Sequence, residues 1–193
     1  MNFLAHSFLS FSEEQLVGNM IADFIKNSDR KFLPLEVQKG IVLHREIDTF
    51  TDSHPIISEA KKVFQPLVRL YSGAFVDVSM DFFLANDCNI YTEPQWKEHS
   101  EKVYQTLWKY QEILPERFLK LLPKMEKDDW LYNYRYDWGI QFSLQNVLNK
   151  ALYLEKKLPV FQAFEKDKSL LQKSYHQFFP ELQKHIQKKA SEL

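Results

Sequence analysis

Residues 35–50 read LEVQKGIVLHREIDTF, and this stretch decides the fold class. Its apolar side chains recur at the spacing of one face of an α-helix, and they are Val37, Ile41, Leu43 and Ile47. Pro34, just before the stretch, suits the first position of a helix. The pattern predicts one long helix from Leu35 to about Phe50.

Helical patterns cover nearly all of the remaining chain. Ser12, followed three residues later by Gln15, is a capping-box signal that opens a helix to about Ile25. Further helices are predicted from Pro55, over 73–84, over 92–113, as a short pair punctuated by Pro115 and Pro123, over 137–154, and as two last helices framed by Pro159 and Pro180. No repeat or linker divides residues 1–193. The sequence predicts a single compact all-α domain of seven or more helices.

Composition excludes several classes of function. The chain has 193 residues, a net charge of −1 and only four glycines, of which no two lie within twenty residues of each other. A dinucleotide fingerprint or a P-loop needs clustered glycines, so phosphate must be handled here by side chains or metal. The near-zero charge argues against a nucleic-acid partner. The single cysteine excludes a disulfide framework.

The chain also lacks the patterns of exported and membrane proteins. Polar residues interrupt the apolar N-terminal stretch and no basic residue precedes it, which makes a poor signal peptide. No apolar run is long enough to cross a bilayer. We therefore expect a cytoplasmic protein without a membrane partner. The sequence leaves the oligomeric state open.

Two pairs of polar residues recur at a spacing of four, which places both members of each pair on one helix face. They are His44 with Asp48 and Asp77 with Asp81. The first pair is also compatible with an ordinary helix surface. The second pair has very apolar flanks, and like charges one turn apart repel. Such carboxylates favour a partner, and a divalent cation is a suitable one.

Three more polar residues interrupt apolar segments in the first part of the chain. His6 ends the run Asn2-Phe3-Leu4-Ala5-His6, and Asp23 lies within 20–25 with Asn19 one turn earlier. Taken alone, His6 is equally compatible with a hydrogen-bonded core histidine, and Asp23 with an arginine partner. Imidazole with several carboxylates is a ligand set for Mn²⁺, Fe²⁺ or Mg²⁺. Such an ion polarises a phosphoryl oxygen and lowers the pKa of bound water.

A group of basic residues flanks these candidates in the sequence. Ordinary solvated surface is one interpretation, and a docking patch for an acidic partner is the other. The group comprises Lys26, Arg30, Lys31, Lys39, Arg45, Lys61, Lys62 and Arg69.

Short blocks in a fixed order give the chain a resemblance to a known family. They are Asn2-Phe3-Leu4-Ala5-His6, Gly18-Asn19, Asp23-Phe24, Gly40-Ile41, Leu43-His44-Arg45, Ile47-Asp48, Phe50-Thr51-Asp52, His54-Pro55, Asp77-Val78, Asp81 and Phe83-Leu84, and then Trp130-Leu131, Tyr134-Arg135 and Gln145-Asn146-Val147-Leu148. In these blocks the chain resembles the acyl carrier protein phosphodiesterases. The likeness is dense over residues 1–85 and weak over 86–129.

The resemblance implies an all-α, divergent HD-like phosphohydrolase that removes the 4′-phosphopantetheine arm from holo acyl carrier protein. It implies Mn²⁺, with Mg²⁺ or Fe²⁺ as alternatives. The metal and catalytic candidates that it implies are Asp23, His44, Asp48, Asp77 and Asp81, with His6 a further metal candidate. Arg45 is the catalytic and phosphate-holding candidate, and Asn19 and Lys26 complete the predicted substrate-binding residues. The acidic carrier protein would dock on the basic flank.

The chain departs from the family pattern at two places. Phe82 stands where the family usually has histidine, and Asn86-Asp87-Cys88 replaces a more basic or polar pair followed by tryptophan. The departure at Phe82 keeps one alternative open, an HD-like phosphohydrolase of a nucleotide or another small phosphodiester. A second alternative is a non-catalytic domain that binds acyl carrier protein or another helical partner and whose carboxylates are structural. The aromatic stretch 130–138 is interpreted as core rather than as a channel for pantetheine.

Overall fold

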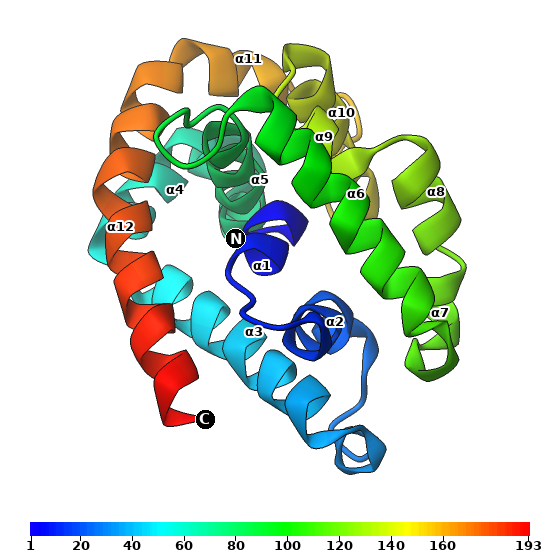
Figure 1. The fold of residues 1–193 in the computed structure, drawn as a ribbon. Helices are drawn as coiled ribbons and strands as arrows, with labels where there is room; N and C mark the ends of the chain where they lie inside the picture. The colour runs from blue at the N-terminus through cyan, green and yellow to red at the C-terminus, as the bar shows by residue number, and fades with distance from the viewer.

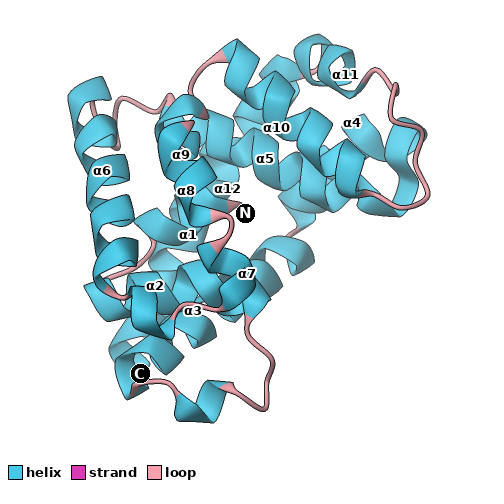
Figure 2. Cartoon of the chain, turned by 90° about the vertical axis from the view of Figure 1, so that its right-hand side faces the viewer, coloured by secondary structure: helices cyan, strands magenta, loops and turns pink.

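The chain is helical from end to end in the computed structural model, which describes residues 1–193 (Figure 1). Twelve α-helices and four 3₁₀ turns follow one another with no strand (Figure 2). The α-helices are α1 Phe3–Phe8, α2 Glu13–Ile21, α3 Leu35–Ser53, α4 Pro55–Val68, α5 Ser72–Ala85, α6 Glu93–Lys109, α7 Glu116–Leu119, α8 Leu122–Lys127, α9 Trp130–Asn133, α10 Asp137–Lys150, α11 Val160–Lys166 and α12 Lys168–Glu192. The predicted all-α fold class is confirmed.

The short helix α1 lies at the centre of the molecule, and the longer helices surround it (Figures 1 and 2). It packs against α2 and α5, while α12 packs across α3, α4 and α5. A single cluster of 44 buried hydrophobic residues extends from Met1 to Ile186 and joins these elements. The N-terminal segment, including His6, is therefore held inside the fold.

Several predicted helix boundaries are confirmed. The hydroxyl of Ser12 accepts a 3.2 Å hydrogen bond from the backbone amide of Gln15 and caps α2. Helix α4 begins at Pro55, and α5 covers the predicted 73–84 with one residue more at each end. Proline suits the start of α4 because the first turn of a helix leaves its amide groups without internal partners.

Other boundaries differ from the prediction. Pro180 lies inside α12, because the exposed proline removes one backbone hydrogen bond while the residues around it, such as Phe179 and Leu182, stay buried in the core. Helix α10 ends at Lys150 rather than near Leu154. The Lys156 ammonium donates to the carbonyl oxygens of Leu148 and Ala151 at this end of the helix. Helices α1 and α9 are too short to show a sequence period.

Two glycines allow α2 and α3 to approach each other at backbone distance. A Cβ atom on Gly18 would lie 2.0 Å from the carbonyl oxygen of Val37, and one on Gly40 would lie 2.1 Å from that of Gln15. Both contacts are with backbone atoms, which cannot move aside as a flexible side chain does. The close approach brings Asn19 of α2 against His44 of α3.

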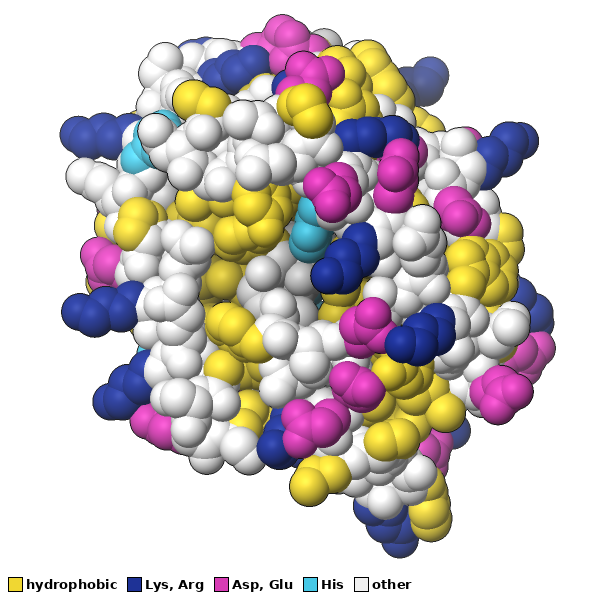
Figure 3. All heavy atoms as spheres, viewed as in Figure 1, with side chains coloured by type: hydrophobic (Ala, Val, Ile, Leu, Met, Phe, Trp, Pro, Cys, Tyr) yellow, Lys and Arg dark blue, Asp and Glu magenta, His cyan; other side chains and the backbone are white.

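The surface carries charges of both signs. Figure 3 shows lysine, arginine, aspartate and glutamate side chains intermingled on one face, in keeping with the net charge of −1. No helix has both the length and the apolar composition that a membrane crossing needs.

Candidate active site

Three polar side chains from two helices meet at the centre of the fold. His6 comes from α1, and His44 and Asp48 come from adjacent turns of α3. Their candidate ligand atoms all lie within 4.8 Å of one another. Nε2 of His44 is 3.1 Å from one carboxylate oxygen of Asp48, and Nε2 of His6 is 3.3 Å from the other. Asp48 therefore lies between two imidazoles.

Asn19 fixes the orientation of both histidine rings from behind. Its side-chain oxygen accepts a 2.8 Å hydrogen bond from Nδ1 of His6, and its backbone oxygen accepts one of 2.8 Å from Nδ1 of His44. The amide nitrogen of Asn19 donates to the carbonyl oxygen of His6 and to the hydroxyl of Ser10. Both Nδ1 atoms must carry hydrogen, because they face oxygen acceptors. In the neutral imidazoles both Nε2 atoms then carry lone pairs.

The Nε2 atom of His44 is buried and has no hydrogen-bond partner. Carboxylate oxygens of Asp48 and Asp23 lie 3.1 Å and 3.3 Å away, but they are not aligned to accept a hydrogen bond from it. A lone pair facing carboxylate oxygens is repelled unless a proton or a metal cation lies between them. Two imidazole nitrogens and nearby carboxylates, with the rings held by a further residue, form a suitable donor set for a divalent transition metal.

Electrostatics in the cluster favours one positive charge, on His44. The two imidazole rings stack with their centroids 4.0 Å apart, so both cannot readily be protonated. Burial and the neighbouring His44 lower the pKa of His6 to about 4. Burial also opposes the charge on His44, but Asp23 and Asp48 outweigh it and raise the pKa of His44 to about 9. A bound cation would supply the same positive charge.

Both nearby carboxylates are ionised at neutral pH. Burial works against the charge on Asp48, but His44 and His6 outweigh this effect and hold its pKa well below the usual range. The contact with His44 lowers the pKa of Asp23. Although the sequence places Asp23 in an apolar run, its side chain is 80% exposed. It lies at the open side of the cluster.

The second predicted carboxylate pair lies outside this cluster. Asp77 forms a 2.8 Å ion pair with the amino group of Met1. Asp81 is fully buried, and its carboxylate accepts hydrogen bonds from the backbone amides of Asn2, Leu4 and Ala5 at 2.8–3.4 Å. The structure therefore gives Asp81 a different place from the predicted one, because its oxygens cap α1 and so hold His6 in position.

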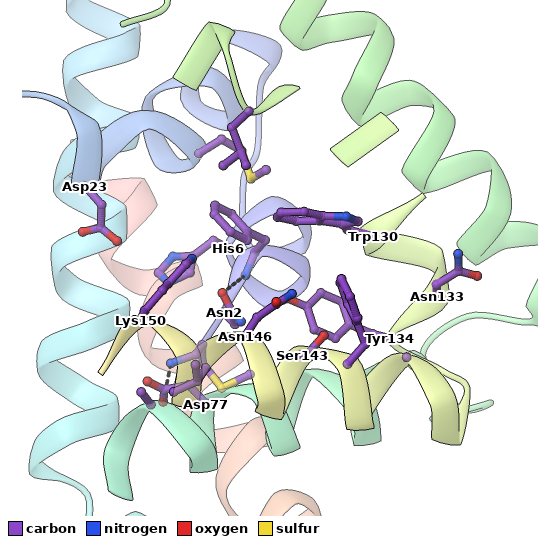
Figure 4. Close-up of a pocket in the computed structure, with 18 of the residues that line it drawn as sticks. Asn2, His6, Asp23, Asp77, Trp130, Asn133, Tyr134, Ser143, Asn146 and Lys150 are labelled. Carbon is purple, nitrogen blue, oxygen red and sulfur yellow. Dashed lines mark hydrogen bonds and ion pairs between the residues drawn. The ribbon is translucent and has the colours of Figure 1, made fainter. Parts of the chain in front are cut away.

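A cleft of about 870 Å³ opens in front of the cluster. One wall carries His6, Asp23, His44 and Asp48, and the opposite wall is built from α8, α9 and α10 (Figure 4). The residues of that opposite wall include Lys124, Trp130, Tyr134, Trp138, Asn146 and Lys150.

A comparison with known protein families covers most of the chain. A sequence model described as acyl carrier protein phosphodiesterase matches residues 1–182. The chain belongs to the acyl carrier protein phosphodiesterase family. Family members are phosphodiesterases, which are hydrolases, so the predicted enzyme class is confirmed at the level of the family.

Individual members of the family are similar over nearly their full length. An acyl carrier protein phosphodiesterase of Yersinia pestis is 29% identical over 197 residues, covering 98% of this chain and 99% of the relative. One from Enterobacter sp. (strain 638) is 29% identical, covering 94% and 95%. One from Escherichia coli O157:H7 (strain EC4115 / EHEC) is 30% identical, covering 98% and 100%. No solved structure matches the chain.

The predicted substrate-binding residues of this family member lie outside the open cleft or are already fully bonded. Asn19 has no exposed surface and uses its side-chain amide within the protein. Arg45 is exposed and donates to the side-chain oxygen of Asn27, and neither Arg45 nor Lys26 lines the cleft. The free cationic groups of the cleft are instead on the α8–α10 wall, at Lys124, Lys127 and Lys150.

The departure at Phe82 is explained by packing. Its ring is 5% exposed and makes edge contacts with Phe83 and Phe164, and the Lys168 ammonium lies 4.6 Å above it. Phe82 does not line the cleft. The aromatic ring therefore replaces a polar side chain in the core, away from the histidines.

The aromatic stretch after residue 129 was only partly interpreted correctly. Tyr134 is buried as expected, but Trp138 is 58% exposed and both residues line the cleft. The missed signal is a spacing of four residues along α10, which places Trp138, Phe142, Asn146 and Lys150 on one helix face.

Proposed function

We propose that this protein hydrolyses the phosphodiester that joins the 4′-phosphopantetheine arm to a serine of acyl carrier protein. Water adds to phosphorus, the bond between phosphorus and the serine oxygen breaks, and a proton goes to that oxygen. The products are apo carrier protein and free 4′-phosphopantetheine. Membership of the family supports this substrate, and the unpartnered Nε2 atom of His44 among ionised carboxylates carries the chemical argument.

The residues present fit a divalent cation, which we propose to be Mn²⁺, with Mg²⁺ or Fe²⁺ as alternatives. His6, His44 and Asp48 would hold it, with Asp23 at the open side. When bound, such an ion withdraws charge from a phosphoryl oxygen and lowers the pKa of water. Asp77 and Asp81, which were also predicted as ligands, would support the site through the N-terminal segment.

The remaining tasks fall to side chains of the chain. Asn19 holds both imidazole rings so that their Nε2 atoms face the cleft. Asp23 is ionised and exposed beside His44, so its carboxylate can accept a proton from water. The lysines of the opposite wall offer positive charge to the phosphate oxygens.

Basic side chains near the cluster would guide the carrier protein. Lys26 and Lys31 follow Asp23 in the chain, are exposed and make no ion pair within the protein. Arg45 is exposed on α3, one residue after His44. Opposite charge between this flank and an acidic carrier would steer the encounter and increase its rate, with a strong dependence on salt.

The experiment that tests the proposal follows the mass of the carrier protein. The purified protein is incubated with Mn²⁺ and holo acyl carrier protein, and we expect the carrier to lose the mass of the arm. The Asp48→Asn variant serves as the control and should leave the carrier intact. An unchanged carrier with fresh metal-loaded protein contradicts the proposal.

The same assay separates the alternatives. Faster turnover of a small phosphodiester or nucleotide than of the carrier would favour the second phosphohydrolase interpretation. Carrier binding without turnover, and without metal uptake, would favour a non-catalytic binding domain. Phe82, whose departure from the family pattern motivated a different substrate, is buried and does not line the cleft. The HD-like relationship stays a prediction.

A further inference from the structure

One face of α10 presents a graded series of side chains to the cleft. Trp138, Phe142, Asn146 and Lys150 follow one another at intervals of four residues, and all four line the cleft. Trp138 is 58% exposed and Phe142 is 45% exposed. Two large aromatic side chains so exposed on one wall mark a surface suited to an apolar ligand group. The next two side chains of the series are the amide of Asn146 and the ammonium group of Lys150.

The polar end of this series lies toward the histidine cluster. The Asn86 amide at the end of α5 donates a 3.0 Å hydrogen bond to the carbonyl oxygen of Arg135, just before α10 begins. The two helices pack together and run in opposite directions, so Lys150 lies at the same end as Asp77. Figure 4 shows Lys150 and Asp77 at one side of the view and Tyr134 and Asn133 at the other.

The polar groups on this face are free for a ligand. Lys150 is exposed and forms no ion pair within the protein. Asn146 and Ser143 are half-buried on the cleft side of α10, and neither side chain makes a hydrogen bond within the protein. A half-buried amide or hydroxyl without a protein partner is available to donors and acceptors of a bound molecule.

From this arrangement we propose that the α10 face binds the pantetheine arm lengthwise. The phosphate would lie at Lys150, the amide groups at Asn146 and Ser143, and the thiol-bearing end at Phe142 and Trp138. The arm has roughly thirteen bonds from phosphorus to sulfur, or ~15 Å when extended. Trp138 and Lys150 are separated by about 18 Å along the helix. This assignment rests on the proposed function and deepens it.

With this arrangement, α10 would discriminate between ligands by the length of the arm. A short phosphodiester reaches only the cluster and Lys150, whereas the full arm also covers the two exposed aromatic rings. The terminal CH₂–CH₂–SH group of the arm would transfer about two methylene groups out of water, which corresponds to about tenfold in affinity. Preference for pantetheine-bearing substrates would then come from α10 and not from the histidine cluster.

Calorimetric titration of two ligands tests the assignment without any turnover. The probes are 4′-phosphopantetheine and phosphorylated pantothenamide, which ends at the second amide and lacks CH₂–CH₂–SH. We expect the wild-type protein to bind the longer ligand about tenfold more tightly. Trp138→Ala and Phe142→Ala should each reduce this preference to about threefold or less, and Lys150→Met should weaken both ligands equally.

A matched control comes from the loop just after α10. Tyr153 is 86% exposed and does not line the cleft, so Tyr153→Ala removes an exposed aromatic ring and should keep the full preference. Circular dichroism confirms that each variant is folded. An undiminished preference in both aromatic variants overturns the proposal, as does failure of the wild-type protein to bind 4′-phosphopantetheine at millimolar concentration.

The outcomes separate this proposal from the proposed function. Carrier hydrolysis without any arm-length preference overturns the α10 assignment and leaves the proposed function standing. An arm-length preference that disappears in Trp138→Ala, together with an intact carrier in the mass assay, supports the α10 assignment and contradicts the proposed function.

Discussion

The two walls of the cleft were encoded in the sequence in very different ways. The cluster wall draws its polar residues from short blocks near the N-terminus, in which His44 and Asp48 are already one turn apart on the same helix. The α10 wall consists of aromatic, amide and lysine side chains that occur on many helical surfaces. Histidine and aspartate within apolar segments have few structural roles, so they stand out in the cluster wall. Aromatic, amide and lysine side chains on a helix have many, so they do not stand out in the α10 wall. Chemistry was therefore visible in the sequence, whereas shape was not.

The two walls also differ in how much support surrounds them. Asn19 and the buried Asp81 fix His6 and His44 through a chain of hydrogen bonds. On the α10 wall, the side chains of Phe142 and Trp138 are exposed. A preorganised cluster fits a task that requires fixed geometry, and an open aromatic wall fits recognition of a flexible ligand. Changes in the cluster should therefore alter chemistry, and changes in α10 should alter selectivity.

The largest effect is expected from a change in the cluster wall. Asp48→Asn keeps the shape of the side chain but removes the charge that lies between the two imidazoles. Carrier hydrolysis should fall on the order of a thousandfold, and bound metal should fall in parallel. Activity and metal content by mass spectrometry check this.

Asp52 offers a matched control one turn farther along α3. Its carboxylate also borders the cleft but is paired with Lys61 at 2.8 Å. Asp52→Asn should change activity by less than about threefold, since exposed ion pairs contribute little. Equal loss in both variants would show that charge in the cleft matters and that the cluster does not.

The next largest effect should come from the packing behind the cluster wall. A Cβ atom in Gly40→Ala would lie 2.1 Å from a backbone oxygen of α2, so α2 and α3 must separate. We expect a loss of about 3 kcal/mol in the free energy of unfolding, together with weaker metal uptake. Chemical denaturation measures the first and metal titration the second.

Alanine substitutions at two other glycines test whether the effect on metal uptake is specific to the cluster wall. In Gly139→Ala a Cβ atom would lie 1.9 Å from the carbonyl oxygen of Asn133, so α10 must shift from α9. Stability should fall similarly while metal uptake is kept. In Gly73→Ala the nearest atom is the end of the Lys61 side chain at 3.4 Å, and stability should change by less than about 1 kcal/mol. Loss of metal uptake in Gly139→Ala would contradict the independence of the two walls.

Much of the fold could be predicted because helix signals are local. The capping hydroxyl of Ser12 and the proline at position 55 act within one turn of the chain, so their effects can be interpreted without the tertiary structure. Pro180 was misinterpreted because burial of its neighbours in the core overrides the local penalty. The four-residue helix α9 offers no period to detect.

The site was predictable only where ligand atoms share a helix. His44 and Asp48 lie together by spacing alone, but His6 joins them through the capping of α1 by Asp81, a contact between residues far apart in the sequence. Spacing could not show that the carboxylate of Asp81 already accepts hydrogen bonds from backbone amides. For the same reason, spacing could not show that Arg45 does not line the cleft.

A smaller effect is expected when the support of the cluster is weakened and the cluster itself is kept. Asn19→Ala removes the acceptor for Nδ1 of His6, while the backbone carbonyl that accepts from His44 remains. Mn²⁺ affinity should fall by roughly 10–100-fold. Titration with Mn²⁺ measures this. Ser10→Ala is the control, because the Ser10 hydroxyl accepts from the Asn19 amide and donates to the backbone carbonyl oxygen of His6 but touches neither imidazole ring. Unchanged Mn²⁺ affinity in Asn19→Ala would show that the rings need no such support.

The smallest predicted effect separates acid sensitivity of the fold from that of the cleft. His99 of α6 lies 3.0 Å from the hydroxyl of Ser7, and burial, followed by the charge of Lys102, lowers its pKa to about 4. The unfolded chain takes up a proton near pH 6.5 and the folded chain only near pH 4, so acid favours unfolding in this interval. Between pH 7 and pH 5 this group should cost about 1–2 kcal/mol of stability.

Burial raises the pKa of Asp81 to about 7, which acts in the opposite direction, so the wild-type curve alone cannot assign the effect. His99→Gln keeps a donor toward Ser7 and should be less sensitive by that amount across the same interval in urea denaturation. Equal slopes for the two proteins would place the acid sensitivity elsewhere, with the histidines that face the cleft as the first candidates.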